Sequence, residues 1–211
     1  MRLLTTIAGR FFDALWLVNG NGTGTTSPKS KGIVDVVFGI APDGRKSWRA
    51  RGSGSAGQRP LLLAQMDGID KILDLGDLTA EKEHELMCPL NKIGTVDIYI
   101  ASHHGFNQSG SAVLVHAVAP RVAIVDNGAK KGGSPSALDI IRSSPNLAAL
   151  WQLHFSEEAG PAHNTVLEFI ANSPGLDAAN YLKLAANPDG AFAVFNSRTK
   201  QSQQYTALPP R

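Results

Sequence analysis

The chain has 211 residues, of which 43% are hydrophobic and 18% are charged, a composition that can bury the core of one ordinary domain. The low charged fraction excludes a solvated polyelectrolyte, and there is no run of about 18 uninterrupted apolar residues that could cross a bilayer. The single cysteine, Cys88, excludes an internal disulfide and a cysteine-rich metal framework.

Charge is distributed unevenly along the chain, although the formal net charge is only +2. Residues 1–60 contain nine Lys and Arg against three Asp and no Glu, whereas residues 61–211 contain 11 basic and 15 acidic residues. This shift predicts a basic, linker-rich N-terminal segment over residues 1–60 and a separate globular part over residues 61–211. The basic segment could attract nucleic acid, but a poorly ordered leader is the simpler interpretation.

The first 60 residues combine two short predicted elements with long linkers. Amphipathic spacing predicts a helix over residues 3–18 that ends at the Asn-Gly cluster of residues 19–22. A β-branched run predicts a strand over residues 33–38, and turn-forming residues predict loops over 19–32 and 41–60. Because no long apolar run with a small-residue cleavage site opens the chain, we expect no secretory signal and predict a cytoplasmic protein.

From residue 61 onward, predicted strands and helices alternate. Hairpins are expected over residues 61–75, around Asp67-Gly68, and over 181–195. The remaining predicted elements are strands at 96–101, 121–125 and 150–155, and helices at 79–86, 110–118, 136–143 and 164–171. This alternation predicts an α/β fold with a mixed, largely internal sheet and flanking helices.

Two polar motifs follow apolar strands in this part of the chain. Residues 73–78 read LDLGDL and residues 100–105 read IASHHG. Active residues of α/β proteins tend to lie where strands end, and carboxylate and imidazole groups are both good zinc ligands. Gly76 and Gly105 would allow the sharp turns that place Asp77 and the pair His103-His104 in a crevice. Either motif alone is commonly structural, but the two together favour a metal site.

These motifs, together with the run APRVAIVDNG at residues 119–128, resemble the second half of metallo-β-lactamase-fold hydrolases, in particular their ComEC-like branch. The resemblance covers roughly residues 61–210. It implies an αββα sandwich of two layered sheets with flanking helices and a zinc site at one edge. It also implies hydrolysis of a small-molecule or phosphodiester substrate. The bond that is cleaved would be a phosphodiester, an ester or a lactone.

The resemblance further implies roles for individual residues. Asp77 would be a metal-binding carboxylate, and one of His103 and His104 would also bind metal, with His104 favoured. His103 would then support the site or contact the leaving group, which makes it the candidate catalytic side chain. Asn127 and Lys131, in the loop after the strand at 121–125, could contact an anionic substrate.

The sequence departs from the family pattern upstream of these motifs. Members of the family carry an HxHxDH motif before the GD motif and a further His between them, whereas this chain has no His before His84. Asp77 and one His supply two protein ligands, and catalytic zinc usually has three. We therefore expect an incomplete zinc site and an incomplete sandwich, in a chain that represents the C-terminal half of the fold behind a replaced or truncated N-terminus.

Two functions from different classes follow. The first is a zinc-dependent hydrolase of the metallo-β-lactamase superfamily, and the alternative is a non-catalytic remnant or binding module that retains part of the fold. An incomplete sandwich would expose apolar faces, so we also consider a homo-oligomer. A nucleic-acid partner, bound in a salt-dependent way through the basic segment, is less favoured, and no membrane partner is expected.

Overall fold

The computed structural model describes residues 71–206, apart from 176–178 and 188–189, and the backbone of four earlier strands. These strands are β1 (Leu3–Thr6), β2 (Ala14–Asn19), β3 (Val34–Phe38) and β4 (Leu62–Gln65). The chain forms two compact units, the first of Met1–Arg51, Gln65–Asp70 and Leu176–Arg211, and the second of Gly52–Ala64 and Lys71–Gly175. All five residues that the sequence nominates for the site lie in the second unit.

The second unit is built on a sheet whose strands follow one another in sequence order. The described neighbours run parallel from β5 onward, and β4 lies beside β5. Asp74 is level with Ile100, and Ile100 with Ile124, so β5, β6 and β7 end at the same edge of the sheet. The parallel strands are β5 (Lys71–Asp74), β6 (Ile98–Ile100), β7 (Val122–Val125), β8 (Ala149–His154) and β9 (Ile170–Asn172).

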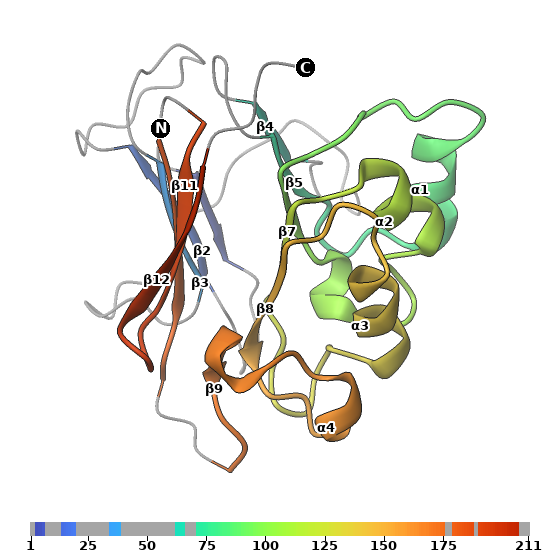
Figure 1. Cartoon of the computed structure of the whole chain (residues 1–211). Coiled ribbons are helices and arrows are strands. Elements are labelled where there is room, and N and C mark those ends of the chain that lie inside the picture. Colours follow the sequence, from blue (N-terminus) through green and yellow to red (C-terminus); the bar gives the residue numbers. More distant parts are fainter. Residues whose placement is uncertain are drawn as a thin grey trace. The chain divides into compact units, whose positions relative to one another are not determined.

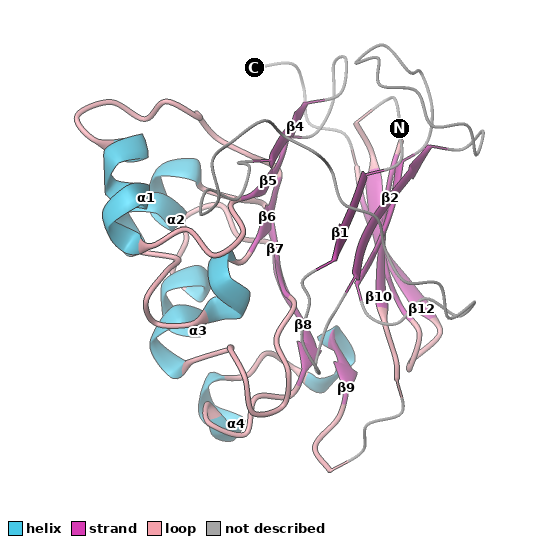
Figure 2. Cartoon of the chain, turned by 180° about the vertical axis from the view of Figure 1, so that it is seen from behind, coloured by secondary structure: helices cyan, strands magenta, loops and turns pink. Residues whose placement is uncertain are grey.

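Three helices lie on one face of this sheet, as Figures 1 and 2 show from opposite sides. They are α1 (Ala80–Met87), α2 (Ala112–Val118) and α3 (Pro135–Arg142). In the chain, α1 follows β5, α2 follows β6, and α3 follows β7. This is the crossover arrangement that parallel strands require, because a short turn cannot return the chain to the start of the next parallel strand.

The start of α2 is fixed by side chains that take up its free backbone N–H groups. Ser111 caps the helix, with its Oγ accepting the N–H of Leu114. Glu83 of α1 is fully buried, and its carboxylate accepts the N–H of Gly110 at 2.7 Å and that of Ser111 at 2.8 Å. A buried carboxylate therefore ties α1 to the loop that leads into α2.

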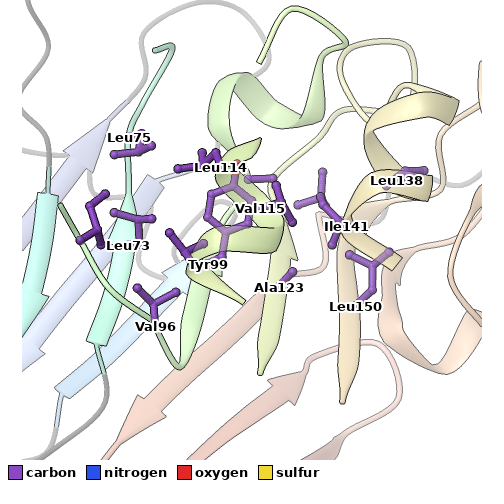
Figure 3. Packing of buried hydrophobic residues seen from close by; sticks show 14 of the residues in the cluster. Leu73, Leu75, Val96, Tyr99, Leu114, Val115, Ala123, Leu138, Ile141 and Leu150 are labelled. Atoms are coloured by element: carbon purple, nitrogen blue, oxygen red, sulfur yellow. The ribbon is translucent and has the colours of Figure 1, made fainter. Parts of the chain in front are cut away.

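The main hydrophobic core lies between the parallel sheet and its helices (Figure 3). Leu73, Tyr99 and Leu150 from the strands meet Leu114 and Leu138 from the helices, and none of the five is more than 5% exposed. Side chains of a strand alternate between the two faces of the sheet, so only half of them join this cluster. The intervening residues of β6 and β7 are buried as well, as is usual for parallel strands.

The first unit contains an antiparallel sheet in the order β1-β2-β3-β10-β11-β12. Its C-terminal strands are β10 (Leu182–Ala186), β11 (Phe192–Asn196) and β12 (Gln201–Tyr205). Side chains of β10 and β11 alternate between buried and half-buried, which is the pattern of a sheet with one covered face. The chain thus has an α/β fold that combines a parallel and an antiparallel sheet with helices.

Most predicted elements after residue 70 are confirmed, with shifts of one to three residues at their ends. The predicted helix over 164–171 is wrong: this stretch contains the 3-10 turn η2 (Leu167–Phe169) and then β9, while the short helix α4 (Gly160–His163) precedes it. Strand β12 is absent from the prediction. The turn at Asp67-Gly68 and the loop at 41–60 lie outside the described residues, as does 20–32 of the other predicted loop.

The prediction of a helix over residues 3–18 is also wrong, because both ends of this stretch form strands, β1 and β2, that pair with each other. Three strands of the N-terminal segment join the antiparallel sheet, through the pairing of β3 with β10. The predicted division of the chain at residue 60 stays a prediction. The two compact units described above have other boundaries, because the first unit contains both Met1–Arg51 and Leu176–Arg211. Among the helices of the described residues, none combines the length and the apolarity needed to cross a bilayer.

Candidate functional site

The candidate site lies where three neighbouring parallel strands end. Asp74 is the last residue of β5, and Asp77 lies in the turn just after it. His103 and His104 belong to the 3-10 turn η1 (Ser102–Gly105), which follows β6, and Asp126 comes directly after β7. The C-terminal edge of a parallel sheet is where α/β proteins usually bind ligands.

Backbone hydrogen bonds join the three loops at this edge. The N–H of His103 donates to the carbonyl of Gly76 at 2.8 Å, which links the turn after β5 to η1. The N–H of Gly133 donates to the carbonyl of His104, also at 2.8 Å, which links η1 to the loop after β7. The relative positions of Asp77, the two histidines and Asp126 are therefore set by backbone contacts.

The two histidines have an unusual backbone conformation. Both lie in the left-handed region, with φ of 52° for His103 and 57° for His104. This conformation costs a residue with a Cβ about 1–2 kcal/mol. The preceding residue is held firmly, since Tyr99 Oη accepts the N–H of Ser102 and lies 2.9 Å from its Oγ. Burial raises the pKa of Tyr99, so this phenol stays neutral.

The imidazole of His104 lies beside a buried carboxylate. His104 is 6% exposed and Asp126 is 8% exposed, and Nδ1 of the imidazole lies 3.1 Å from Oδ2 of Asp126. The two groups are at ion-pair distance but not in good hydrogen-bond alignment. Burial alone would lower the pKa of His104, but the contact with Asp126 outweighs burial and the net pKa is raised.

Asp74 shows that the neighbouring carboxylates act on one another. Burial raises the pKa of Asp74 to about 6, although the N–H of Gly76 donates to its Oδ1 at 2.8 Å and opposes the rise. The negative charges of Asp126 and Asp77 add to the rise, and the charge of His104 opposes it. Such effects are strong only at short range, so the four side chains form one electrostatic cluster.

His103 lies apart from the contact between His104 and Asp126. Its imidazole is half-buried, with Nδ1 3.5 Å from Ser109 Oγ and its ring packed edge-on against Phe106 at 5.1 Å between centroids. Among residues 71–206, no carboxylate forms a hydrogen bond or an ion pair with this imidazole. Its predicted role in catalysis stays a prediction.

Asn127 links the ends of two neighbouring strands. This residue is fully buried, and its amide nitrogen donates to the carbonyls of Gly128 and His154 at 3.1 and 2.9 Å. Its Oδ1 accepts the N–H of His154 at 3.3 Å. These bonds use both amide hydrogens and tie the end of β7 to the end of β8, and the predicted contact of Asn127 with an anionic substrate stays a prediction.

Lys131 acts electrostatically on the cluster. It is half-buried in the turn that Gly128 closes, where the N–H of Gly128 donates to the Lys131 carbonyl at 2.8 Å. Its positive charge acts to lower the pKa of His104. The predicted contact of Lys131 with an anionic substrate stays a prediction.

The donor set can be compared with what a zinc ion needs. Among the residues that the structure describes, no group of three or more His, Cys, Asp and Glu side chains is arranged to hold a metal ion. Catalytic zinc usually has three protein ligands, and Asp77 and His104 supply two. The described residues therefore do not fit zinc by themselves.

Sequence reasoning assigns no role to Asp126 or Asp74. Both lie in the motifs described above, Asp74 in LDLGDL and Asp126 in APRVAIVDNG. One feature of the sequence could have identified both as candidate site residues: each is an acidic residue at the C-terminal end of a run that is otherwise largely apolar. No family model matches this chain, and a search of curated proteins finds no match either.

Proposed function

We propose that this chain is a metal-dependent hydrolase of the metallo-β-lactamase superfamily that acts on a phosphodiester, ester or lactone. The grouping of Asp74, Asp77, Asp126 and His104 at the C-terminal edge of the parallel sheet supports this proposal. Carboxylate oxygens and imidazole nitrogens are common ligands of divalent cations. The positive charge of Lys131, which acts on His104, supports a substrate with negative charge, such as a phosphodiester.

Zinc is the cation that the proposal names, and its site would need help from outside the described residues. Asp77 and His104 would each supply one donor, and His103 would contact the leaving group. At least one further donor would come from another chain, since catalytic zinc usually has three protein ligands.

The fold of the family is part of the same proposal. We propose that the parallel and antiparallel sheets belong to an incomplete αββα sandwich. Support comes from the mixed α/β class and from strands β6 and β7, whose side chains are buried on both faces. Association of two copies, binding to nucleic acid and a cytoplasmic location remain predictions.

The alternative function is a non-catalytic remnant or binding module. It is favoured by the absence of a three-donor metal group among the described residues and of any His before His84. The two functions differ in what the cluster does: it holds a metal in the hydrolase and holds none in the remnant.

Metal content and hydrolysis, measured on the same preparations, distinguish the two functions. The full chain is equilibrated with zinc, freed of excess metal, and assayed on bis(p-nitrophenyl) phosphate, p-nitrophenyl acetate and a simple lactone. The hydrolase predicts stoichiometric zinc and turnover of at least one substrate. The zinc content and the rate of turnover should both be lower in the Asp77→Asn and His104→Gln variants than in the wild type.

The matched control is Asp139→Asn. Asp139 contacts His163 at 2.8 Å on the surface of α3, away from the cluster, so the change removes a His–Asp contact without touching the site. This variant should keep its zinc and its activity. Trace zinc in the wild type, with no difference among the variants, would contradict the hydrolase and support the remnant.

A further inference from the structure

The contact between Asp126 and His104 leaves buried polar atoms on both side chains without a hydrogen-bond partner. Oδ2 of Asp126 lies 3.1 Å from Nδ1 of His104, at ion-pair distance. Within the part of the chain that the structure describes, neither Nδ1 of His104 nor the other carboxylate oxygen, Oδ1, forms a well-aligned hydrogen bond. Both side chains are about nine-tenths buried or more, with exposed fractions of 7% for His104 and 10% for Asp126.

Stability does not explain why a carboxylate lies here. An unsatisfied buried polar atom costs about 1–3 kcal/mol, and a buried ion pair often fails to recover the cost of removing two charges from water. The nearby Asp74 and Asp77 are acidic as well, so electrostatic repulsion adds to the cost. An arrangement that costs stability calls for a role in the site.

We propose that Asp126 is a positioning residue for His104: its carboxylate faces Nδ1 and holds the imidazole so that Nε2 is the nitrogen presented to a cation or substrate. This proposal adds a residue role to the site of the proposed function, and it rests on that function for the identity of the group that His104 binds. A carboxylate beside one ring nitrogen keeps the proton on that nitrogen, which leaves the lone pair on the other. Asp126 would therefore set both the orientation and the tautomer of His104.

This inference also separates the two histidines of the HHG motif. His104 has a buried carboxylate at one nitrogen, whereas the Nδ1 of His103 is 3.5 Å from the neutral hydroxyl of Ser109. A hydroxyl at this distance fixes neither the ring nor its proton strongly. The geometry therefore points to His104 as the histidine that offers a nitrogen lone pair to the bound group. His103 has no equivalent positioning group.

The chain contains a second His–Asp contact that serves as an internal control. Nδ1 of His163 lies 2.8 Å from Oδ2 of Asp139, but both side chains are far more exposed, at 38% and 47%. Asp139 also contacts Arg142 at 3.1 Å, so its charge is shared. The control pair has the same chemistry as the site pair but lies on the surface.

The test is to determine which nitrogen of His104 carries the proton, by long-range proton–nitrogen NMR correlation. The full chain is labelled with ¹⁵N-histidine and held with a chelator at alkaline pH, where the imidazoles are neutral. The signal of His104 is identified by its loss in His104→Gln. We expect the proton on Nδ1 in the wild type and a shift toward the Nε2–H form in Asp126→Ala. Asp139→Ala should alter His163 and leave His104 unchanged.

Two results would overturn the proposal. One is a wild-type His104 with its proton on Nε2, a result that needs no variant and stands even if Asp126→Ala fails to fold. The other is an unchanged tautomer in folded Asp126→Ala, which is what a purely structural role predicts. Because the chelator removes metal, the outcome does not depend on zinc binding or on hydrolysis.

Discussion

Gly132 packs directly against the backbone of His104: a Cβ placed on Gly132 would lie 2.2 Å from the carbonyl oxygen of His104 and 2.8 Å from its Cβ. Glycine is the residue that fits here, because any side chain would push the loop after β7 away from η1. The position also has a φ of +73°, which residues with a Cβ rarely adopt. The placement of His104 therefore depends on a glycine that is 28 residues away in the sequence.

The first prediction concerns this contact. Gly132→Ala should lower the free energy of unfolding by about 1–3 kcal/mol more than Gly175→Ala does, because overpacking adds to the backbone strain. Gly175 is the matched control, with a φ of +74° and, in the described structure, no atom within 4 Å of the place where a Cβ would lie. Urea unfolding measures the difference, and equal effects of the two substitutions would show that the close approach is absent.

The second prediction concerns the carboxylate that caps α2. Glu83→Gln replaces one accepting oxygen with an NH₂ group that faces a backbone N–H, and we expect a loss of about 1–3 kcal/mol in the free energy of unfolding. Glu85→Gln, on the same helix, removes an exposed contact with Lys82 and should have little effect. A similar small effect for Glu83→Gln in urea unfolding would contradict a buried cap.

The third prediction concerns pH. The folded pKa of Asp74 is about 6, above its ordinary value of 3.8, so the folded state holds this proton more tightly than the unfolded state does. The favourable contribution of Asp74 to the free energy of unfolding is therefore present at low pH, and it is lost as the pH rises from about 4 to about 6. Asp74→Asn should remove this loss, because an Asn can still accept the N–H of Gly76.

The measurement is urea unfolding of both proteins with a chelator, at acidic and at neutral pH. Above pH 7, Asp74→Asn should be more stable than the wild type by about 2–3 kcal/mol, and the difference should shrink toward zero near pH 4. A variant that is less stable than the wild type at neutral pH would show that the ionised carboxylate is not penalised there.

Much of the second unit could be predicted from the sequence, because its strands and helices follow local patterns. Apolar runs such as residues 121–125 are buried strands, and Pro135 marks the start of a helix. The errors arise where tertiary pairing decides the structure. Residues 201–205 read QSQQY, which has no apolar alternation, and they form β12 through pairing with β11. Residues 3–18 have apolar residues that fit a helix, yet pair as β1 and β2.

The candidate site could be predicted only in part for a similar reason. The sequence motifs place Asp77 and His104 at strand ends, and the structure brings both into one electrostatic cluster. Asp126 joins that cluster because β7 lies beside β6 in the sheet, a relation that no local pattern contains. Asn127 looks like a substrate contact because it is a polar loop residue, but its contacts with His154 depend on how β8 lies beside β7.

The fourth prediction tests the structural role of Asn127. Asn127→Ala would leave buried backbone groups of His154 without partners, and we expect a loss of about 1–3 kcal/mol in the free energy of unfolding. Lys130→Ala, in the same loop, changes an exposed side chain 3.7 Å from Glu157 and should have little effect. Thermal unfolding compares the two, and an Asn127→Ala protein as stable as the wild type would contradict the structural role.

The most direct measurement of the central claim, that Asp77 and His104 belong to one cation site, uses paramagnetic Mn²⁺ as the probe. Mn²⁺ is added in small steps to the full chain labelled with ¹⁵N-histidine, and the broadening of each imidazole signal is followed. We predict that the signal of His104 broadens first, well before those of His116 and His163, and that Asp77→Asn abolishes this preference. Uniform broadening of all histidines, or a preference for His104 that survives in Asp77→Asn, would contradict the claim.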